Sequence, residues 1–191
     1  GDHPDLHSFP TRRSSDLVNP ANIGLMFYEE PIFAPCTALS AMALVRESGA
    51  AIRGAEAVVV GHSRIVGKPI ALLLTNEMAT VTTCHVATRD LAEHTRRADI
   101  LVVAVGKRGV ITSAMVKPGA VGIDVGINRW REVGPDGQAM SRIAGDVDFE
   151  AVSRVAGAIS PVPGGVGSVT TATLLRNTAE AARRRMAGGH W

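Results

Sequence analysis

The chain has 191 residues, 46% of them hydrophobic and 20% charged, with a formal net charge of +2. This composition provides a buried core and argues against disorder. The small charge and the 4% of aromatic residues argue against a nucleic-acid partner, and no apolar run approaches the roughly 20 residues of a membrane span, so we also expect no membrane partner.

The first 17 residues, GDHPDLHSFPTRRSSDL, show neither a period of two nor one of 3.6 residues. Residues 7–17 resemble one reading frame of a common sequencing-adapter oligonucleotide. We therefore interpret residues 1–17 as a non-native leader, with a disordered native N-terminus as the alternative. Residues 18–36 combine turn residues with an apolar cluster and are interpreted as the remnant of a preceding domain, and residues 188–191 as a tail.

Predicted helices and strands alternate from residue 37 onward. Thr37 is expected to cap a helix that runs through Glu47 and stops at Gly49. Pro135-Asp136-Gly137 predicts a turn inside a surface excursion or hairpin over 130–147. We predict strands at 57–60, 79–84, 100–105, 120–126 and 158–160, and further helices from 67, at 90–98 (capped by Asp90), 112–116, 148–155 (capped by Asp148) and 170–186. This alternation predicts an α/β fold with a Rossmann-like, doubly wound parallel sheet over residues 37–187.

Three glycines, Gly61, Gly106 and Gly126, follow three predicted strands. Ligands of such sheets bind at the carboxyl ends of the strands, and a glycine there lets a bulky ligand approach the backbone. The helix that begins near Gly67 is expected to point free N–H groups at an anion. The alternative is that these glycines only make turns, but three in register favour a nucleotide.

Several segments carry a family resemblance. VVVGHSRIVGKP at 58–69 resembles a G-R-S-x-I-V-G-x-P segment, and ADILVVAVGKRGVI, GDVDF and ISPVPGGVGSVTTATLLRNT match further segments in order. Together they resemble the bifunctional methylenetetrahydrofolate dehydrogenase/methenyltetrahydrofolate cyclohydrolase family over residues 18–182. The resemblance implies its C-terminal NAD(P)-binding domain, with the N-terminal catalytic domain missing.

The family resemblance implies a reaction and a site. A nicotinamide cofactor oxidises 5,10-methylenetetrahydrofolate to the methenyl form, which is hydrolysed to 10-formyltetrahydrofolate in cytoplasmic one-carbon metabolism. Tetrahydrofolate derivatives and a second copy of the chain are the implied partners. The expected cofactor-binding residues are Gly61, His62, Ser63, Arg64 and Ile127, and the loop between cofactor and folate comprises Pro163, Gly164, Gly165 and Gly167.

No catalytic residue is assigned within this chain. The family's lysine lies in a Y-x-x-x-K motif of the preceding domain, whereas the one tyrosine here, Tyr28, is followed by Glu29-Glu30-Pro31-Ile32. Neither Asp124 nor Asp146 is assigned to catalysis, and Asp124, at the end of a buried strand, is interpreted as an acceptor for loop N–H groups. Two alternatives remain: a stand-alone, non-catalytic dinucleotide-binding module, and a shikimate-dehydrogenase-like oxidoreductase, which PVPGGVG disfavours.

Cofactor choice depends on two loops. His62 stands where the family has an arginine, and the second strand ends in Cys84-His85-Val86 without the carboxylate typical of NAD-specific sites. We therefore predict NADP, with NAD possible as the alternative. Since histidine changes its charge between about pH 5 and pH 8, we expect the preference for NADP to grow as the pH falls from about 8 to about 6.

Cys36 and Cys84 are the two cysteines. They form no C-x-x-C pair and no spacing with histidine that is typical of zinc, so we expect neither a metal site nor a disulfide framework. The basic run at 183–185 is interpreted as a solvated helix end.

Overall fold

The computed structural model describes residues 20–29, 33–133 and 138–187. The interpreted leader 1–17, the tail 188–191 and the predicted turn at 135–137 lie outside these ranges. The helices are α1 (Pro20–Phe27), α2 (Cys36–Glu47), α3 (Gly67–Asn76), α4 (Leu91–Thr95), the 3₁₀ helix η1 (Ser113–Met115), α5 (Phe149–Val152) and α6 (Val166–Met186). The strands are β1 (Glu56–Val60), β2 (Thr80–Cys84), β3 (Ile100–Val103), β4 (Val121–Asp124), β5 (Asn128–Val133), β6 (Ala139–Ala144) and β7 (Ala158–Ile159).

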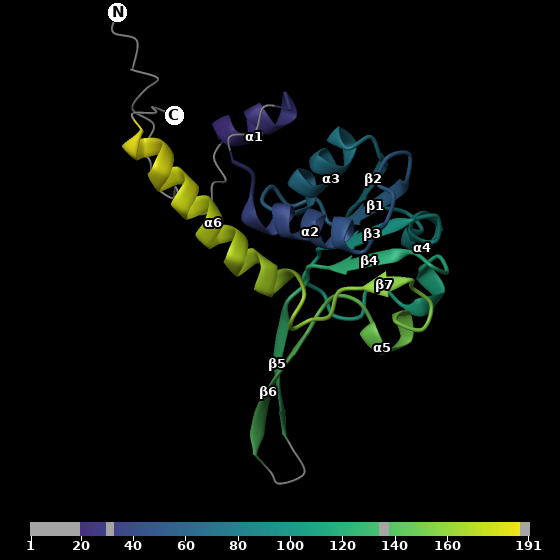
Figure 1. Ribbon diagram of the computed structural model, residues 1–191. Coiled ribbons are helices and arrows are strands. Elements are labelled where there is room, and N and C mark those ends of the chain that lie inside the picture. Colours follow the sequence, from purple (N-terminus) through teal and green to yellow (C-terminus); the bar gives the residue numbers. More distant parts are fainter. Residues whose placement is uncertain (1–19, 30–32, 134–137, 188–191) are drawn as a thin grey trace, which may run out of the picture.

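Five parallel strands form the central sheet in the order β2-β1-β3-β4-β7 (Figure 1). The predicted doubly wound sheet is therefore confirmed. The chain leaves β1 for β2 on one side and returns for β3 on the other. In folds of this type, ligands bind at the carboxyl ends of the strands, at the point where the strand order reverses.

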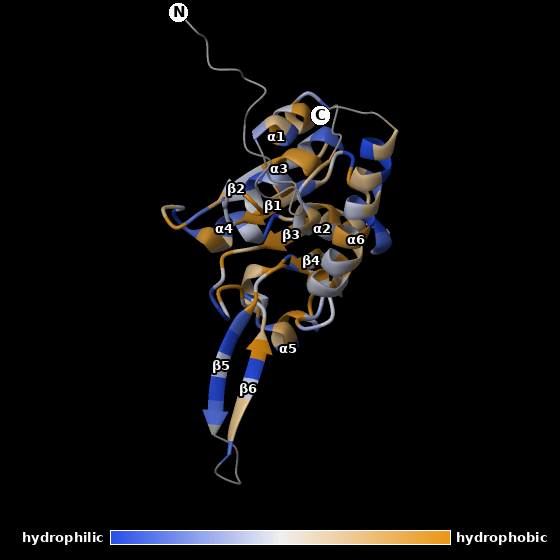
Figure 2. Cartoon of the chain, turned by 90° about the vertical axis from the view of Figure 1, so that its left-hand side faces the viewer, coloured by the Kyte–Doolittle hydropathy of each residue, from blue (hydrophilic) through white to orange (hydrophobic). Residues whose placement is uncertain are grey.

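Strands β1 and β3 contribute buried side chains to two hydrophobic cores, one on each face of the sheet, because successive side chains point to opposite faces. Ala57 and Val59 pack with α2, α3 and the start of α6, whereas Val58 and Val60 pack with residues around α4 and α5. Strand β3, with the sequence ILVV, is accordingly hydrophobic along its whole length (Figure 2). This burial on both faces explains the continuous apolar runs in the sequence.

The two helix caps predicted from aspartates are confirmed. The carboxylate of Asp90 accepts the N–H of Glu93 at 3.1 Å, and that of Asp148 accepts the N–H of Ala151 at 3.3 Å. The predicted Thr37 cap is wrong. Helix α2 begins at Cys36, directly after Pro35 and without a side-chain cap, so that Thr37 lies in its first turn.

The last helix begins at Val166, four residues before the predicted start at 170. Residues 166–169, Val-Gly-Ser-Val, make a poor helix by intrinsic propensity. However, Val166 is only 4% exposed and belongs to the core on the α2 side. Tertiary burial therefore extends the helix, and Gly167 lies in its first turn instead of in a loop.

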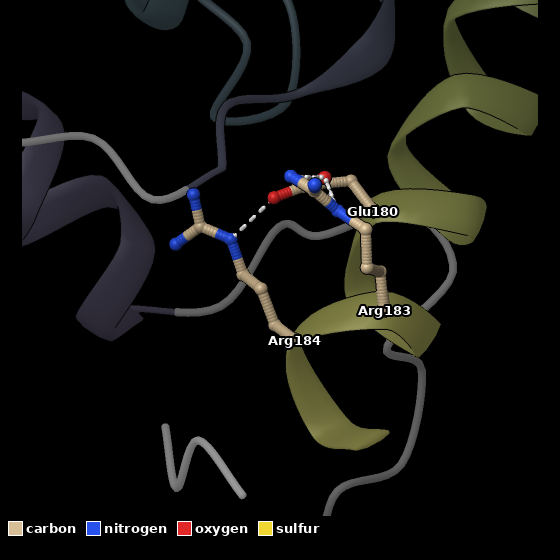
Figure 3. Close-up of polar contacts among 3 residues, drawn as sticks. All are labelled: Glu180, Arg183 and Arg184. Atoms are coloured by element: carbon tan, nitrogen blue, oxygen red, sulfur yellow. Dashed lines mark hydrogen bonds and ion pairs between the residues drawn. The ribbon is translucent and has the colours of Figure 1, made fainter. Parts of the chain in front are cut away.

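The basic run lies in the last turn of α6, as the sequence predicts. Arg183 and Arg184 both pair with Glu180, at 2.8 and 2.7 Å (Figure 3). The hydrogen bonds from these guanidinium groups hold the pKa of Glu180 below its ordinary value, and the bond from Arg184 has the largest effect. The pair's contribution to folding is therefore present at neutral pH and is lost as the pH falls through that lowered pKa.

Strands β5 and β6 form the predicted hairpin, an antiparallel pair that runs from Asn128 opposite Ala144 to Val133 opposite Ala139. The hairpin extends away from the central sheet (Figure 1). At its base, the guanidinium of Arg108 lies 4.2 Å from the centre of the Trp130 ring. This cation–π contact links the loop after β3 to the hairpin.

The turn between β1 and α3 is packed tightly against neighbouring backbone. Gly61 has a φ of +123°, and a Cβ there would lie 2.2 Å from the carbonyl oxygen of Ala104. A Cβ on Gly67 would lie 2.0 Å from the carbonyl oxygen of Gly61. Both positions therefore require glycine, since the obstructing atoms belong to the backbone.

Replacing Gly67 by alanine is expected to destabilise the domain by about 1–3 kcal/mol, because the new methyl group displaces the β1–α3 turn. Thermal unfolding of the 191-residue chain measures the effect as a lower midpoint. Gly24→Ala in α1 is the matched control, because a Cβ there meets no atom within 4 Å. An unchanged midpoint for Gly67→Ala would show that the turn adapts freely.

Candidate cofactor site at the carboxyl edge of the sheet

The loop between β1 and α3 presents His62, Ser63 and Arg64 to solvent at the carboxyl edge. The hydroxyl oxygen of Ser63 accepts the N–H groups of Val66 and Gly67, at 3.2 and 3.3 Å, and its carbonyl accepts the N–H of Lys68 at 3.0 Å. The expectation that these N–H groups are free for an anion is therefore wrong. The hydroxyl of Ser63 still has its own proton to donate to a phosphate.

The three predicted open glycines differ from one another. The missing Cβ of Gly61 makes room for the backbone of Ala104, and that of Gly126 for the carboxyl group of Asp146, 2.1 Å from the ideal Cβ position. Only Gly106, of these three, faces open space, with a φ of +70°. At Gly61 and Gly126 the missing Cβ therefore makes room for neighbouring protein atoms.

A buried carboxylate, Asp146, organises the loop after β3. One of its oxygens, Oδ2, accepts the N–H groups of Val105 and Gly106 at 2.7 and 2.8 Å. The other, Oδ1, accepts the side-chain amide of Asn128 at 2.9 Å. Asp146 is fully buried, so these bonds replace the water that an exposed carboxylate would bind.

A second buried carboxylate, Asp124, is the last residue of β4 and holds the backbone after β4 and after the hairpin. It accepts the N–H groups of Gly126 and Asp146, both at 3.0 Å, and of Val147 at 2.9 Å. Burial raises the pKa of this carboxyl above its ordinary value, although the three N–H groups oppose the shift. The interpretation of Asp124 as an acceptor for loop N–H groups is confirmed, and the structure shows that Asp146 accepts such groups as well.

A pocket of about 200 Å³ opens beside these carboxylates. It brings the predicted residue Ile127 together with the predicted residues Pro163, Gly164, Gly165 and Gly167, which lie in a later segment of the chain. A Cβ on Gly165 would lie 2.5 Å from the carbonyl oxygen of Pro161, so this backbone passes close to itself. Sequence reasoning missed two further lining residues from the hairpin, Arg129 and Ile143.

The end of β2 lies beside the β1 loop. The N–H of Gly61 donates to the carbonyl of Cys84 at 2.8 Å, and the rings of His62 and His85 are 5.0 Å apart. His85 was not assigned from the sequence, although its position directly after the second strand was the available signal. Burial raises the pKa of the Cys84 thiol above its ordinary value, which makes it a poor nucleophile.

A larger groove of about 580 Å³ lies at the opposite edge, at the amino ends of the strands. Lys117 and Asp99 line it and form an ion pair at 2.6 Å. In folds of this kind, ligands bind at the carboxyl edge. The smaller pocket is therefore the candidate site. Within the described residues, no group of three or more His, Cys, Asp or Glu side chains is placed to hold a metal ion.

The parallel sheet, its reversal between β1 and β3, and the loops at its carboxyl edge define a dinucleotide-binding domain of the Rossmann type. A family model described as "Tetrahydrofolate dehydrogenase/cyclohydrolase, NAD(P)-binding domain" matches residues 35–186. The chain belongs to this family.

Relatives and solved structures agree with the family. The chain is 54% identical over 172 residues to the bifunctional protein FolD 3 of Roseobacter denitrificans, and the match covers 90% of this chain and 58% of that protein. The FolD methylenetetrahydrofolate dehydrogenase/cyclohydrolase of Campylobacter jejuni is 44% identical, with a TM-score of 0.81 over 90% of this chain and 58% of the other.

The Trypanosoma brucei N5,N10-methylenetetrahydrofolate dehydrogenase-cyclohydrolase, solved with NADP and an inhibitor, is 41% identical with a TM-score of 0.83. That match covers 90% of this chain and 59% of the Trypanosoma protein. The chain therefore spans less than two thirds of the length of these relatives.

Replacing Asp146 by asparagine is expected to cost about 1–3 kcal/mol of stability, because an NH₂ group would then face an N–H donor. Asn128 cannot rotate its amide to compensate, since its Nδ2 also donates to the carbonyl of Gly145 at 2.9 Å. Chemical denaturation of both chains measures the difference.

Glu132→Gln on the hairpin is the matched control for the loss of one carboxylate, since Glu132 is exposed and pairs only with Arg142 among the bonds described. Equal stability of Asp146→Asn and the parent would contradict the assigned role of Asp146.

Proposed function

We propose that the chain is the cofactor-binding part of an NADP-dependent enzyme of one-carbon metabolism. The enzyme oxidises 5,10-methylenetetrahydrofolate to 5,10-methenyltetrahydrofolate and hydrolyses the product to 10-formyltetrahydrofolate. The observation that carries the proposal is the joint presence, at one sheet edge, of the β1 loop and the pocket between Ile127 and residues 163–167. The relatives named above support the substrate class.

Different residues at the carboxyl edge of the sheet bind different parts of the cofactor. We propose that Gly61, His62, Ser63 and Arg64 hold the phosphate and adenosine part, through the hydroxyl of Ser63 and the positive charge of Arg64. Ile127, which is 57% exposed, offers an apolar surface to the nicotinamide ring. Bound NADP supplies the hydride acceptor. Pro163, Gly164, Gly165 and Gly167 form the wall between cofactor and folate.

The catalytic base is proposed to lie outside this chain. Lys117 is paired with Asp99 at the opposite edge, and Lys68 is exposed in the first turn of α3, the helix that follows the β1 loop. The carboxylates of Asp124 and Asp146 already accept hydrogen bonds from backbone N–H groups and, at Asp146, from the side-chain amide of Asn128. The alternative function is a stand-alone, non-catalytic dinucleotide-binding module. The gene sequence upstream of codon 18 distinguishes the two, because only the enzyme continues into a Y-x-x-x-K domain.

We also propose a homodimer in the cytoplasm. An isolated two-stranded hairpin is marginally stable in water, and the β5–β6 hairpin exposes Met140 and Ile143 by 39% and 37%. A second copy would cover these side chains. Cys36 and Cys84 are buried as thiols, the state that a reducing compartment maintains. No helix in the described part of the chain is long and apolar enough to cross a membrane.

The purified chain is expected to bind NADP and to show no hydrolysis of methenyltetrahydrofolate. Binding raises the unfolding midpoint in proportion to the logarithm of the free ligand concentration, which differential scanning fluorimetry measures. Hydrolysis is followed by the loss of methenyltetrahydrofolate absorbance against a heat-killed control. Measurable hydrolysis would refute the placement of the catalytic base, and an unchanged midpoint at saturating NADP would refute the binding proposal.

Replacing Met140 by glutamate is expected to shift the chain from dimer to monomer, because a charge would enter the proposed contact. Sedimentation velocity over a range of concentrations measures the mass. Glu150→Gln on α5 is the control, as a charge change on an exposed residue away from the hairpin. A mass that stays dimeric in Met140→Glu would exclude the hairpin as the contact.

A further inference from the structure

Hydrogen bonds hold the loop after β3 at its two ends. At its start, the N–H groups of Val105 and Gly106 donate to the carboxylate of Asp146. At its end, the N–H of Val110 donates to the carbonyl oxygen of the same residue at 2.8 Å. Between these anchors, residues 107–109 make no hydrogen bond or ion pair with the described part of the chain. The position of this tip therefore depends on other contacts.

One side-chain contact positions the tip. The guanidinium carbon of Arg108 lies 4.2 Å from the centre of the Trp130 ring, within the roughly 6 Å over which an aromatic face attracts a cation. Gly106 and Gly109 flank this region with φ values of +70° and +68°, and a Cβ on either would meet no atom within 4 Å. The backbone of the tip thus crosses open space, and the stacking of Arg108 on Trp130 determines where it lies.

Trp130 connects the tip to one face of the hairpin, whereas the opposite face lines the candidate pocket. Successive side chains of a strand point to opposite faces, so that Asn128 and Trp130 share one face of β5 and Arg129 lies on the other. Asn128 donates to Asp146, the residue that anchors the loop after β3. Arg129 pairs with Ile143 across the hairpin, and both line the pocket. The base of the hairpin therefore has the loop on one face and the pocket on the other.

We infer that Arg108 and Trp130 form a clamp that positions the nicotinamide half of the dinucleotide. The strand order β1-β3-β4 places the loop after β3 between the β1 loop and the end of β4, and hence between the two proposed halves of the cofactor site. Neither residue lines the pocket. They are positioning residues, which act through the loop and the hairpin that they hold together. The inference deepens the proposed function and rests on it.

The strength of the clamp limits its effect on binding. A site that binds only while a loop is in place has its affinity reduced in proportion to the fraction of molecules in that state. An exposed cation–π contact changes such a fraction by about two- to fivefold. We therefore expect loss of the clamp to weaken NADP binding by this factor and to leave binding of the adenosine half unchanged.

Direct attraction of the cofactor by the charge of Arg108 would give a different pattern. Lys107 is the exposed neighbour of Arg108 and carries the same charge, but it stacks on no ring of the described chain. If the charge of the loop attracted the phosphates of NADP, Lys107 and Arg108 would contribute alike. The uncharged ring of Trp130 would then contribute nothing.

The test is isothermal titration of the 191-residue chain with NADP and with adenosine 2′,5′-bisphosphate, a fragment that lacks the nicotinamide half. Arg108→Ala and Trp130→Ala are each expected to weaken NADP binding by about two- to fivefold. The double variant is expected to weaken it no further, because either change removes the same contact. Trp130→Phe keeps an aromatic face and is expected to bind NADP more tightly than Trp130→Ala. All these variants are expected to bind the fragment as the parent does.

Lys107→Ala is the matched control for the loss of one positive charge, and it is expected to bind NADP as the parent does. Equal losses in Lys107→Ala and Arg108→Ala, with none in Trp130→Ala, would overturn the clamp in favour of direct attraction by charge. Equal losses for NADP and the fragment would also overturn it, because a general distortion of the domain weakens both. In these cases the parent still binds NADP. A parent chain that binds neither ligand refutes the proposed function and the inference with it, so that the two failures are distinguishable.

Discussion

Two buried carboxylates, Asp124 and Asp146, connect the loops on which the candidate site depends. Asp146 accepts two backbone N–H groups from the loop after β3, and Asp124 accepts the N–H of Gly126 after β4 and those of Asp146 and Val147 after the hairpin. The two are coupled, since the backbone of Asp146 donates to Asp124 while its side chain serves the neighbouring loop. A change at either residue therefore moves several loops at once.

The glycines of this edge follow from the same constraint. Gly126 and Gly145 lack side chains because the carboxyl groups of Asp146 and Asp124 occupy the positions where a Cβ would lie. Close packing of backbone against carboxylate excludes water and leaves the loops one arrangement. The site is thus preorganised by atoms that need not touch a ligand, which lowers the entropy that binding must overcome.

Many of the helices and strands were predictable from local features of the sequence. The apolar runs at 58–60 and 100–103 and the caps at Asp90 and Asp148 are local signals, and the doubly wound sheet follows from their alternation. The start of α6 was not predictable, because the burial of Val166 against a distant core overrides the low helix propensity of the glycines around it. The Ser63 bonds to the start of α3 were missed because a serine four residues before the start of a helix has several local partners available.

The candidate site was predictable in its members more than in its geometry. Ile127 and residues 163–167 were assigned from the resemblance, and the structure places them in one pocket. Three residues near the site were not predicted, namely Arg129, Ile143 and His85. Their proximity to the site depends on the pairing of β5 with β6 and of β2 with β1. Such contacts between distant segments leave no spacing in the sequence.

A crystal structure of the chain with NADP tests the proposed cofactor site most directly. We expect the cofactor to lie along the carboxyl edge, with its adenosine end at His62 and its nicotinamide beside Ile127 and the 163–167 segment. A cofactor bound instead in the groove lined by Asp99 and Lys117 at the amino edge would contradict the proposed site.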